Sequence, residues 1–479
     1  MKFVGRLNEL ELLSDQIRNK SSSLITILGR RRIGKSTLVK HFSEINKLAL
    51  FEFQGLAPRP RLSNKDQLNN FSQTLFKFLK IKPIEFSDWS QAFSYLNHLV
   101  LSSKKKMVIF LDEISWMGCK DADFAGKLKQ AWDTELSQNT NIILILCGSV
   151  SSWIQKNILT STGFAGRVSL EINLKELSLA ESAELLRLRG HKLNHIDLAK
   201  ILSVTGGVPK YLEEMKHFQT AEANIVNHCF RPSGFLFFEF DRIFSEIFGS
   251  VNQIYKDILV SLKDAPLSPS DLAKKLKRTL NGDISYYLSS LELGGFIRRE
   301  YTWNLSGNES RLSMVRISDN YTRFYLKYIE SRKKRLEKKP LKLNDSLDFL
   351  NWPTLVGIQI ETLILNNISI LVDILKIPSS EIVQLGPYFQ TGTKLRPGVQ
   401  IDCLIQCKRG ILHAVEIKSS PKIGSDILTE VKEKNKRLKL PRGFSVRNHL
   451  VYLDDLSDSV VEADFFDYHI SFSQFISRI

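Results

Sequence analysis

The sequence predicts a multidomain α/β protein, because the chain is long and contains two separate regions rich in apolar strands. At 479 residues it exceeds what one hydrophobic core usually organises, so about two to four domains are expected. Short apolar runs alternate with helical patterns over residues 1–175, which is typical of βαβ units around a parallel sheet. A second group of apolar strands lies within residues 345–479, after a largely helical middle.

The charge balance of the chain favours an anionic partner. Lys and Arg total 67 against 51 for Asp and Glu, which gives a net charge of +16 and a pI near 9.4. Such an excess is typical of proteins that bind nucleic acid and less often of those that bind lipid, although a merely basic surface explains it too. No run approaches about 18 apolar residues, so no membrane span is expected. The five cysteines are scattered and odd in number, which argues for free thiols in a reducing cytoplasm.

Residues 1–175, the first predicted domain, contain a glycine-rich segment. Residues 29–36 read Gly-Arg-Arg-Arg-Ile-Gly-Lys-Ser, which matches G-x-x-x-x-G-K-[ST]. The segment follows an apolar strand over 23–28 and opens a helical pattern, which is the context that this motif requires. Gly29 and Gly34 would let the N–H groups of the loop surround phosphates, and the start of the helix adds its positive dipole end.

The same segment supplies side chains for a nucleotide and its metal. Lys35 would reach the β- and γ-phosphates of ATP, and Ser36 would ligate Mg²⁺. The whole phosphate-binding stretch is expected to run from Gly29 to Thr37. This part of the sequence therefore predicts an ATP site with Mg²⁺.

A strand that ends in carboxylates completes the predicted nucleotide site. The apolar strand over 107–111 leads into Asp112 and Glu113. Asp112 would hold Mg²⁺, directly or through water, and Glu113 would orient and deprotonate the attacking water. Two further candidates stay open. Ser149 is either a sensor of the γ-phosphate or an ordinary turn serine, and Arg167 is either an arginine finger or sensor or an exposed residue without a role.

These motifs resemble those of the archaeal-type ATPases, which belong to the AAA+/STAND group of P-loop proteins. Two more segments carry the resemblance, Phe-Val-Gly-Arg-Leu-Asn-Glu-Leu at 3–10 and Gly-Gly-Val-Pro-Lys-Tyr at 206–211. The resemblance covers roughly residues 1–240 and implies that Arg6 and the segment 206–209 close over the adenine. It also implies a slow switch rather than a motor, and an ATP-dependent homo-oligomer is among the partners to consider.

The middle of the chain predicts two more modules and a connector. Helical patterns over 176–246 predict a small lid, and 331–344 is a basic linker. Residues 247–330 show a helix, a helix-turn-helix pattern and two strand-like runs, the element order of a winged helix. Its recognition helix would be 283–293 and its wing 302–311. Four arginines would contact DNA phosphates: Arg278, Arg298, Arg299 and Arg311. The recognition helix carries no Lys or Arg, so a role in packing beside the ATPase stays open.

The last predicted domain, residues 345–479, contains two apolar strands joined by a Lys-Arg-Gly loop at 408–410. If Gly410 takes the left-handed conformation in this loop, counting outward places Asp402 directly opposite Glu416. Directly opposed residues share one face of a hairpin, with Cβ atoms about 5 Å apart. The sequence therefore predicts two carboxylates side by side on an otherwise apolar hairpin.

Lys418 joins the same face, because it lies two residues from Glu416. Two like charges so close need a partner, and a divalent metal is the natural one; Lys418 would then polarise or help deprotonate the attacking water. Asp402 followed by Glu416-x-Lys418 resembles the core of the PD-(D/E)XK nucleases. That resemblance implies that Glu361, on the preceding helix, completes the metal site. An internal ion pair of Lys418 with Asp402 or Glu416 is the alternative.

Together these features predict a P-loop parallel-sheet ATPase with a helical lid, a winged helix and a C-terminal restriction-endonuclease-like α/β domain. We expect a protein that binds and hydrolyses ATP, binds DNA, and cleaves it with its C-terminal domain under ATP control. Basic residues around the predicted nuclease site suit a phosphodiester substrate: Lys394, Arg396, Lys408, Arg409, Lys422, Lys432, Lys434, Lys436 and Arg437. The alternative is a regulatory switch or scaffold whose C-terminal domain binds nucleic acid or protein without cutting.

Overall fold

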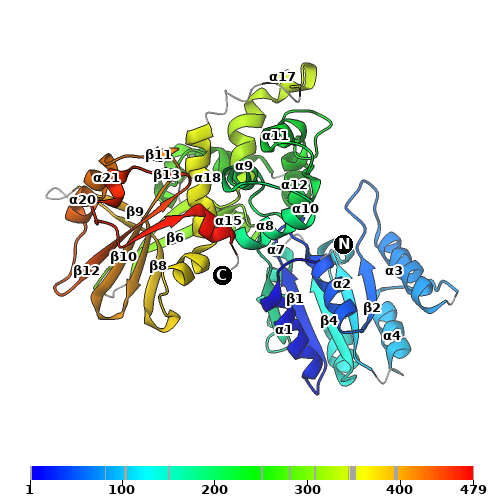
Figure 1. Ribbon diagram of the computed structural model, residues 1–479. Helices are drawn as coiled ribbons and strands as arrows, with labels where there is room; N and C mark the ends of the chain where they lie inside the picture. Colours follow the sequence, from blue (N-terminus) through cyan, green and yellow to red (C-terminus); the bar gives the residue numbers. More distant parts are fainter. Residues whose placement is uncertain are drawn as a thin grey trace. The chain divides into compact units, whose positions relative to one another are not determined.

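The chain forms two compact units, each with its own sheet (Figure 1). The computed structural model describes residues 3–477 except 81, 102–104, 149–150, 250–251, 280–281, 307–308, 343–344, 346–351 and 393–396. The first unit is Met1–Glu176 with Leu293–Gly295, and the second is Leu177–Glu292 with Phe296–Ile479.

The first unit is built on a five-stranded sheet in the order β2-β3-β4-β1-β5, in which every neighbouring pair is parallel. Its strands are β1 (Ser23–Leu28), β2 (Ala49–Gln54), β3 (Met107–Asp112), β4 (Ile142–Cys147) and β5 (Leu170–Asn173). The expected parallel sheet is confirmed, and the strands expected at 23–28 and 107–111 are β1 and β3. In an open parallel sheet, ligands bind outside the carboxyl ends of the strands, where β1 and β3 deliver the two nucleotide motifs.

Two apolar clusters cover the two faces of this sheet. Helices α3, α4 and α6 contribute to one cluster, and α1 and α2 contribute to the other. Every residue of β1, β3 and β4 is buried, which explains why these strands are continuous apolar runs. The helices are α1 (Leu7–Arg18), α2 (Lys35–Ile45), α3 (Asn64–Leu79), α4 (Trp89–Val100), α5 (Ile114–Met117), α6 (Phe124–Thr134) and α7 (Ser151–Ile154).

The second unit begins with five helices in the region expected to be a lid. They are α8 (Leu179–Leu188), α9 (His195–Thr205), α10 (Pro209–Glu214), α11 (Ala221–Cys229) and α12 (Glu239–Phe248). Gly206 ends α9 in the left-handed conformation, and Pro209 begins α10, as the sequence indicates. The buried Gln359 amide donates to the carbonyls of Ser203 and Asn320, so α9 is joined to the C-terminal part of the chain.

Three helices and a β-hairpin follow, and we call residues 252–317 the hairpin module. Its elements are α13 (Asn252–Leu262), α14 (Pro269–Lys275), α15 (Gly282–Leu293), β6 (Ile297–Trp303) and β7 (Glu309–Ile317). Strands β6 and β7 are antiparallel, and Leu267 forms a bridge to Val315 on the open side of β7. Helices α16 (Asn320–Phe324) and α17 (Lys333–Lys338) come next, so the expected basic linker is partly helical.

The C-terminal sheet has the order β14-β12-β10-β9-β8. Strands β8, β9 and β10 are antiparallel, whereas β10, β12 and β14 are parallel. The elements are α18 (Trp352–Asn366), α19 (Ile368–Ile374), β8 (Ile382–Gln390), β9 (Val399–Cys407), β10 (Ile411–Lys418), β11 (Lys422–Ile423), α20 (Asp426–Arg437), β12 (Ser445–Tyr452), β13 (Asp455–Leu456), α21 (Asp458–Val461), β14 (Tyr468–Ser471) and α22 (Phe472–Ile476). The boundaries expected at 246, 330 and 344 therefore all fall inside one compact unit.

None of the described helices is by itself long and apolar enough to cross a membrane. Helices α18 and α19 meet that length and composition only as a pair, and they are bent by 77° relative to each other.

Candidate functional sites

The glycine-rich loop between β1 and α2 has the backbone shape that its sequence requires. Gly29 and Gly34 have φ angles of 138° and 94°, which side chains rarely allow. A Cβ atom at Gly29 would lie 2.5 Å from the carbonyl oxygen of Leu174, so only glycine fits there. The loop leads directly into α2, whose first residue is Lys35.

The predicted polar groups of the nucleotide site lie next to this loop. Lys35 is buried, and its Nζ donates to the carbonyls of Gly29 at 2.8 Å and Arg30 at 3.0 Å. The Ser36 hydroxyl donates to Asp112 Oδ2 at 2.7 Å, so the two predicted Mg²⁺ ligands are already in contact. Glu113 follows in the left-handed conformation, with its N–H donating to Asp112 Oδ1. A phosphate would compete for the Lys35 ammonium, which now donates to the protein's own carbonyls, and Mg²⁺ would compete for the oxygens of Ser36 and Asp112.

The remaining nucleotide-site candidates differ in their surroundings. Arg6 is buried and donates to the carbonyls of Ile33 in the loop and of Lys175, so it braces the phosphate-binding segment. Arg167 donates to both carboxylate oxygens of Asp133, and this pairing holds the pKa of Asp133 down at about 2. Arg167 therefore has a partner on α6 before any nucleotide binds. Ser149 lies outside the described residues.

The hairpin module presents its expected nucleic-acid elements unequally. On α15 the exposed side chains include Asp283, Tyr286 and Glu292, with no basic residue among those that the structure describes there. Two described residues of the stretch expected as a wing, Trp303 and Leu305, contact the C-terminal sheet. Trp303 Nε1 donates to Gln406 Oε1 at 2.6 Å, and the Gln406 amide donates back to the Leu305 carbonyl.

The C-terminal hairpin has the predicted register. The pair Val415 and Cys403 ends the recorded ladder, and the next pair outward is Glu416 and Asp402. Gly410 in the connecting loop has a φ of 76°, as predicted. The backbone N–H of Ile417 donates to Asp402 Oδ2 at 2.9 Å, which fixes that carboxylate against the neighbouring strand.

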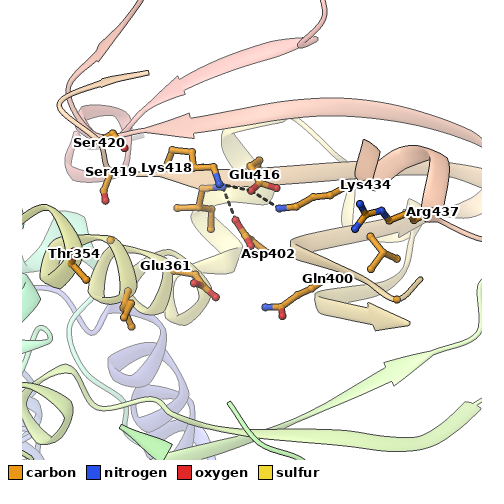
Figure 2. A pocket seen from close by; sticks show the side chains of 15 residues that line it. Thr354, Glu361, Gln400, Asp402, Glu416, Lys418, Ser419, Ser420, Lys434 and Arg437 are labelled. Carbon is orange, nitrogen blue, oxygen red and sulfur yellow. Dashed lines mark hydrogen bonds and ion pairs between the residues drawn. The ribbon is translucent and has the colours of Figure 1, made fainter. Parts of the chain in front are cut away.

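Glu416 lies between two lysines from different elements (Figure 2). Its side chain is 4% exposed, and Oε1 lies 2.9 Å from Lys418 Nζ and 2.6 Å from Lys434 Nζ. Both lysines also contact Glu430, at 3.0 and 3.1 Å. Burial lowers the pKa of both lysines, but Glu416 and its neighbours outweigh burial and raise it. The predicted alternative, an ion pair between Lys418 and Glu416, is therefore present.

Lys434 is the site residue that sequence reasoning missed, since it entered only as one of several basic neighbours. Its signal was the period of the helix: Glu430, Lys434 and Arg437 recur every three or four residues along one side of α20. Nothing in the sequence tells which strand this side faces.

A cavity of about 480 Å³ is lined by the charged side chains of both strands and of α20: Asp402, Glu416, Lys418, Lys434 and Arg437. Glu361 of α18 lines the same cavity. Figure 2 shows Glu361 reaching from its helix toward Asp402 and Gln400. Burial, and then the negative charges of Glu416 and Glu361, raise the pKa of Asp402 to about 8. Three acidic groups therefore share one electrostatic environment, and bringing them together without a cation is unfavourable.

The residues fit a hydrated divalent cation better than an all-protein cage. No three His, Cys, Asp or Glu side chains in the described part of the chain lie close enough together to hold a metal ion. The expected trio of Glu361, Asp402 and Glu416 is thus not gathered into one ligand group. Mg²⁺, however, usually keeps several waters and uses one or two carboxylates plus substrate phosphates. Asp402 and Glu416 would hold such an ion, and their repulsion gives a reason for it to bind.

Comparisons with known proteins match an ATPase domain in the N-terminal part of the chain. Residues 3–215 match the family model described as an ATPase domain predominantly from Archaea. An uncharacterized protein of Methanocaldococcus jannaschii is 25% identical over 333 residues, covering 68% of this chain and 69% of that protein. An uncharacterized ATP-binding protein of the same organism is 44% identical over 46 residues, which are 10% of this chain and 78% of that protein.

Solved structures of P-loop ATPases are also similar to this chain. The Walker-type ATPase PABY2304 of Pyrococcus abyssi has a TM-score of 0.47 and 18% identity, covering 68% of this chain and 96% of its own. The ORC2 protein of Aeropyrum pernix, in its ADPNP-ADP complexes, has a TM-score of 0.42 and 14% identity, covering 70% and 95%. The family match and the loop geometry agree: residues 3–215 form an archaeal-type ATPase domain with a P-loop, which supports an NTP-hydrolysing enzyme.

Proposed function

We propose that this ATPase is also a metal-dependent nuclease that cleaves DNA in the cavity of its C-terminal domain. One observation carries the proposal: Asp402, Glu416 and Lys418 lie on neighbouring strands and line a 480 Å³ cavity together with Lys434 and Arg437. Carboxylates that repel each other beside cationic groups suit a divalent cation and a phosphodiester. In this proposal the C-terminal sheet is a restriction-endonuclease-like domain of the PD-(D/E)XK type.

Each side chain would have a separate task in that cleavage. A divalent cation such as Mg²⁺ would stabilise the charge that develops on the phosphate and acidify a bound water. Asp402 and Glu416 would hold that ion, and Ile417 N–H already orients Asp402. With Glu416 committed to the ion, Lys418 would lose its 2.9 Å ion pair, keep Glu430 at 3.0 Å and be able to orient the attacking water. Lys434 would then keep Glu430 as a partner or move toward the phosphate.

DNA binding is part of the same proposal, and the basic lining of the cavity supports it more than α15 does. Arg437 is exposed, lines the cavity and has no side-chain partner among the described residues. In contrast, α15 exposes Asp283 and Glu292. We therefore assign the binding of DNA to α20. The hairpin module, although it has the element order of a winged helix, would mainly support the C-terminal sheet.

ATP would act as the control input, because the ATPase and the proposed nuclease belong to one chain. Hydrolysis at the site of Lys35 and Asp112 would switch the protein between states that admit or exclude DNA. A cytoplasmic location and ATP-dependent self-association belong to this proposal as well.

A second candidate function is a switch that binds nucleic acid or protein without cutting. One observation favours it: Lys418 and Lys434 neutralise Glu416 in the structure, and the three carboxylates do not form one ligand group. An ion-paired Glu416 needs no metal.

The deciding experiment compares plasmid and single-stranded DNA with the intact protein, with Mg²⁺ or Mn²⁺, and with and without ATP. Cleavage that disappears in Glu416→Ala supports the nuclease, and a parallel loss in Lys35→Ala supports ATP control. Glu433→Ala on the outer side of α20 is the matched control and should cut normally. ATP hydrolysis and DNA binding without any cleavage would favour the switch instead. Cleavage that survives Glu416→Ala would assign it to a contaminant or another site.

A further inference from the structure

A second, smaller cavity lies beside the proposed nuclease site. It has a volume of about 40 Å³ and shares Glu361 and Gln400 with the larger cavity. Its remaining charged lining comes from Glu300 of β6 and Arg316 of β7. Glu361 and Gln400 therefore stand in the wall between two cavities, one that contains the catalytic carboxylates and one lined by the hairpin module.

Arg316 is buried with part of its charge unsatisfied. The side chain is 6% exposed, and it contacts Glu300 at 2.9 Å and Asn366 Oδ1 at 3.4 Å. Its Nη1 atom is buried and makes no hydrogen bond among the described residues. Leaving a buried donor unsatisfied costs about 1–3 kcal/mol, and more when the group is charged. The buried Nη1 of Arg316 would therefore be stabilised by an acceptor across the cavity.

Glu361 is the acidic group on the other side of that cavity. In the described part of the chain it makes no hydrogen bond or ion pair, and it lies beyond 4.0 Å from Arg316. Burial raises the pKa of Glu361, while the charges of Arg316 and Arg323 lower it. A cavity of about 40 Å³ has room for a water that bridges Nη1 of Arg316 to the carboxylate of Glu361.

We propose that Arg316 is a positioning residue, which holds the carboxylate of Glu361 aimed at the larger cavity. The proposal rests on the nuclease function proposed above, because it gives Glu361 a task toward the metal. Arg316 touches neither metal nor DNA, and it acts only through Glu361. Strand β7 thereby helps to shape a cavity whose acidic side chains come from α18, β9 and β10, and the hairpin module becomes part of the proposed nuclease domain rather than a separate DNA reader.

Mn²⁺ binding to the intact, nucleotide-free protein tests this by calorimetry in a double-mutant cycle. Arg316→Met should weaken Mn²⁺ binding about 10-fold, as is usual when a group behind a metal ligand is removed. The same change in a Glu361→Gln protein should have no further effect, since the residue through which Arg316 acts is gone. Arg242→Met, exposed on α12 and lining neither cavity, is the matched control and should bind Mn²⁺ normally.

The Glu300→Gln variant distinguishes a positioning role of Arg316 from a structural one, because its affinity for Mn²⁺ should not fall. Removing Glu300 leaves the charge of Arg316 to Glu361, so Mn²⁺ binding should stay equal or become tighter. A merely structural ion pair would make both Glu300→Gln and Arg316→Met bind more weakly. If Arg316→Met does not fold, Arg316→Lys replaces it; its smaller loss must still vanish in the Glu361→Gln protein.

The outcomes distinguish this inference from the function on which it rests. If Asp402→Asn and Glu416→Ala leave Mn²⁺ binding unchanged, the metal-dependent nuclease itself is refuted. If those two changes abolish binding while Arg316→Met behaves like Arg242→Met, only the role of Arg316 is refuted. An equal loss from Arg316→Met with and without Glu361 would also refute it.

Discussion

The nucleotide site and the C-terminal site hold their charged groups in different ways. Lys35 contacts the carbonyls of Gly29 and Arg30, which lie six and five residues away. Glu416 contacts Lys434, which is 18 residues away on another element. Glu361 interacts electrostatically with Arg316 of the hairpin module. The first site is thus assembled mostly by one contiguous motif, whereas the second depends on several elements that pack correctly. Substitutions at the first site should therefore act locally, whereas those at the second should depend on packing between distant elements.

Trp303→Ala should destabilise the second unit by about 3–5 kcal/mol, since a large buried side chain leaves a cavity. It should also unpair Gln406, with which Trp303 shares a hydrogen bond across 103 residues. Denaturant unfolding followed by circular dichroism would measure the loss, and ATP hydrolysis by the first unit should change little. Trp303→Phe keeps most of the apolar packing and should lose less. An equally large fall in ATP hydrolysis would show that the first unit depends on the second for its stability.

Lys35→Ala should lower ATP hydrolysis about 100-fold or more, the usual effect of removing one preorganised donor to developing charge. The turnover of ATP under saturating Mg²⁺ measures this. Lys40→Ala, on the exposed side of the same helix and paired with Glu52, is the control and should keep normal turnover. If Lys35→Ala also weakened Mn²⁺ binding at the C-terminal site, the contrast between a local and a long-range site would fail.

Arg437→Ala should reduce the salt dependence of duplex binding by about 0.9 in the slope of log K against log[salt], the value for one phosphate contact. Fluorescence anisotropy in a Glu416→Ala background would measure it without cleavage. Lys436→Ala is the neighbouring control, because Lys436 pairs with Glu433 and does not line the cavity. Equal slopes for both variants would mean that the cavity mouth does not carry the DNA contact.

Asp133→Asn should have the smallest effect, a loss of about 0.5–1 kcal/mol near pH 7. Arg167 first, and then Lys129, lower the pKa of Asp133 to about 2. Because the folded pKa is below the unfolded value of about 3.9, this stabilisation is present above about pH 4 and disappears as the pH falls toward 2. Thermal unfolding at several pH values would show the difference between variant and wild type shrinking with acid. The exposed Asp15, paired with Arg18, provides a control, and its Asn variant should change nothing measurable.

Much of the candidate machinery could be predicted because its determinants are short-range. The phosphate-binding loop is a run of eight residues whose backbone must be glycine at two places. The register of the C-terminal hairpin followed from a three-residue loop and from the alternation of side chains, and it correctly placed Asp402 opposite Glu416. The parallel sheet followed from buried strands that are apolar on both faces.

The other contacts of the site depend on which surfaces pack against each other, and the sequence alone does not show this. Two residues of the expected wing serve in packing, because Trp303 and Leu305 find an apolar sheet and a matching glutamine. Lys434 looked like one of several basic residues until α20 was placed over β9 and β10. Arg167 looked free until Asp133 on α6 was brought beside it.

The sequence by itself determined the glycine-rich loop, the opposed carboxylates and the strands of the parallel sheet, because local backbone constraints and the period of each strand or helix settle these. Only the tertiary structure decided that the lid helices, the hairpin module and the C-terminal sheet share one unit. It alone brought Lys434 to Glu416 and Arg316 to the cavity of Glu361. The reason is physical: such contacts depend on how buried apolar faces of distant segments fit together, and burial then fixes the charges that lie between them.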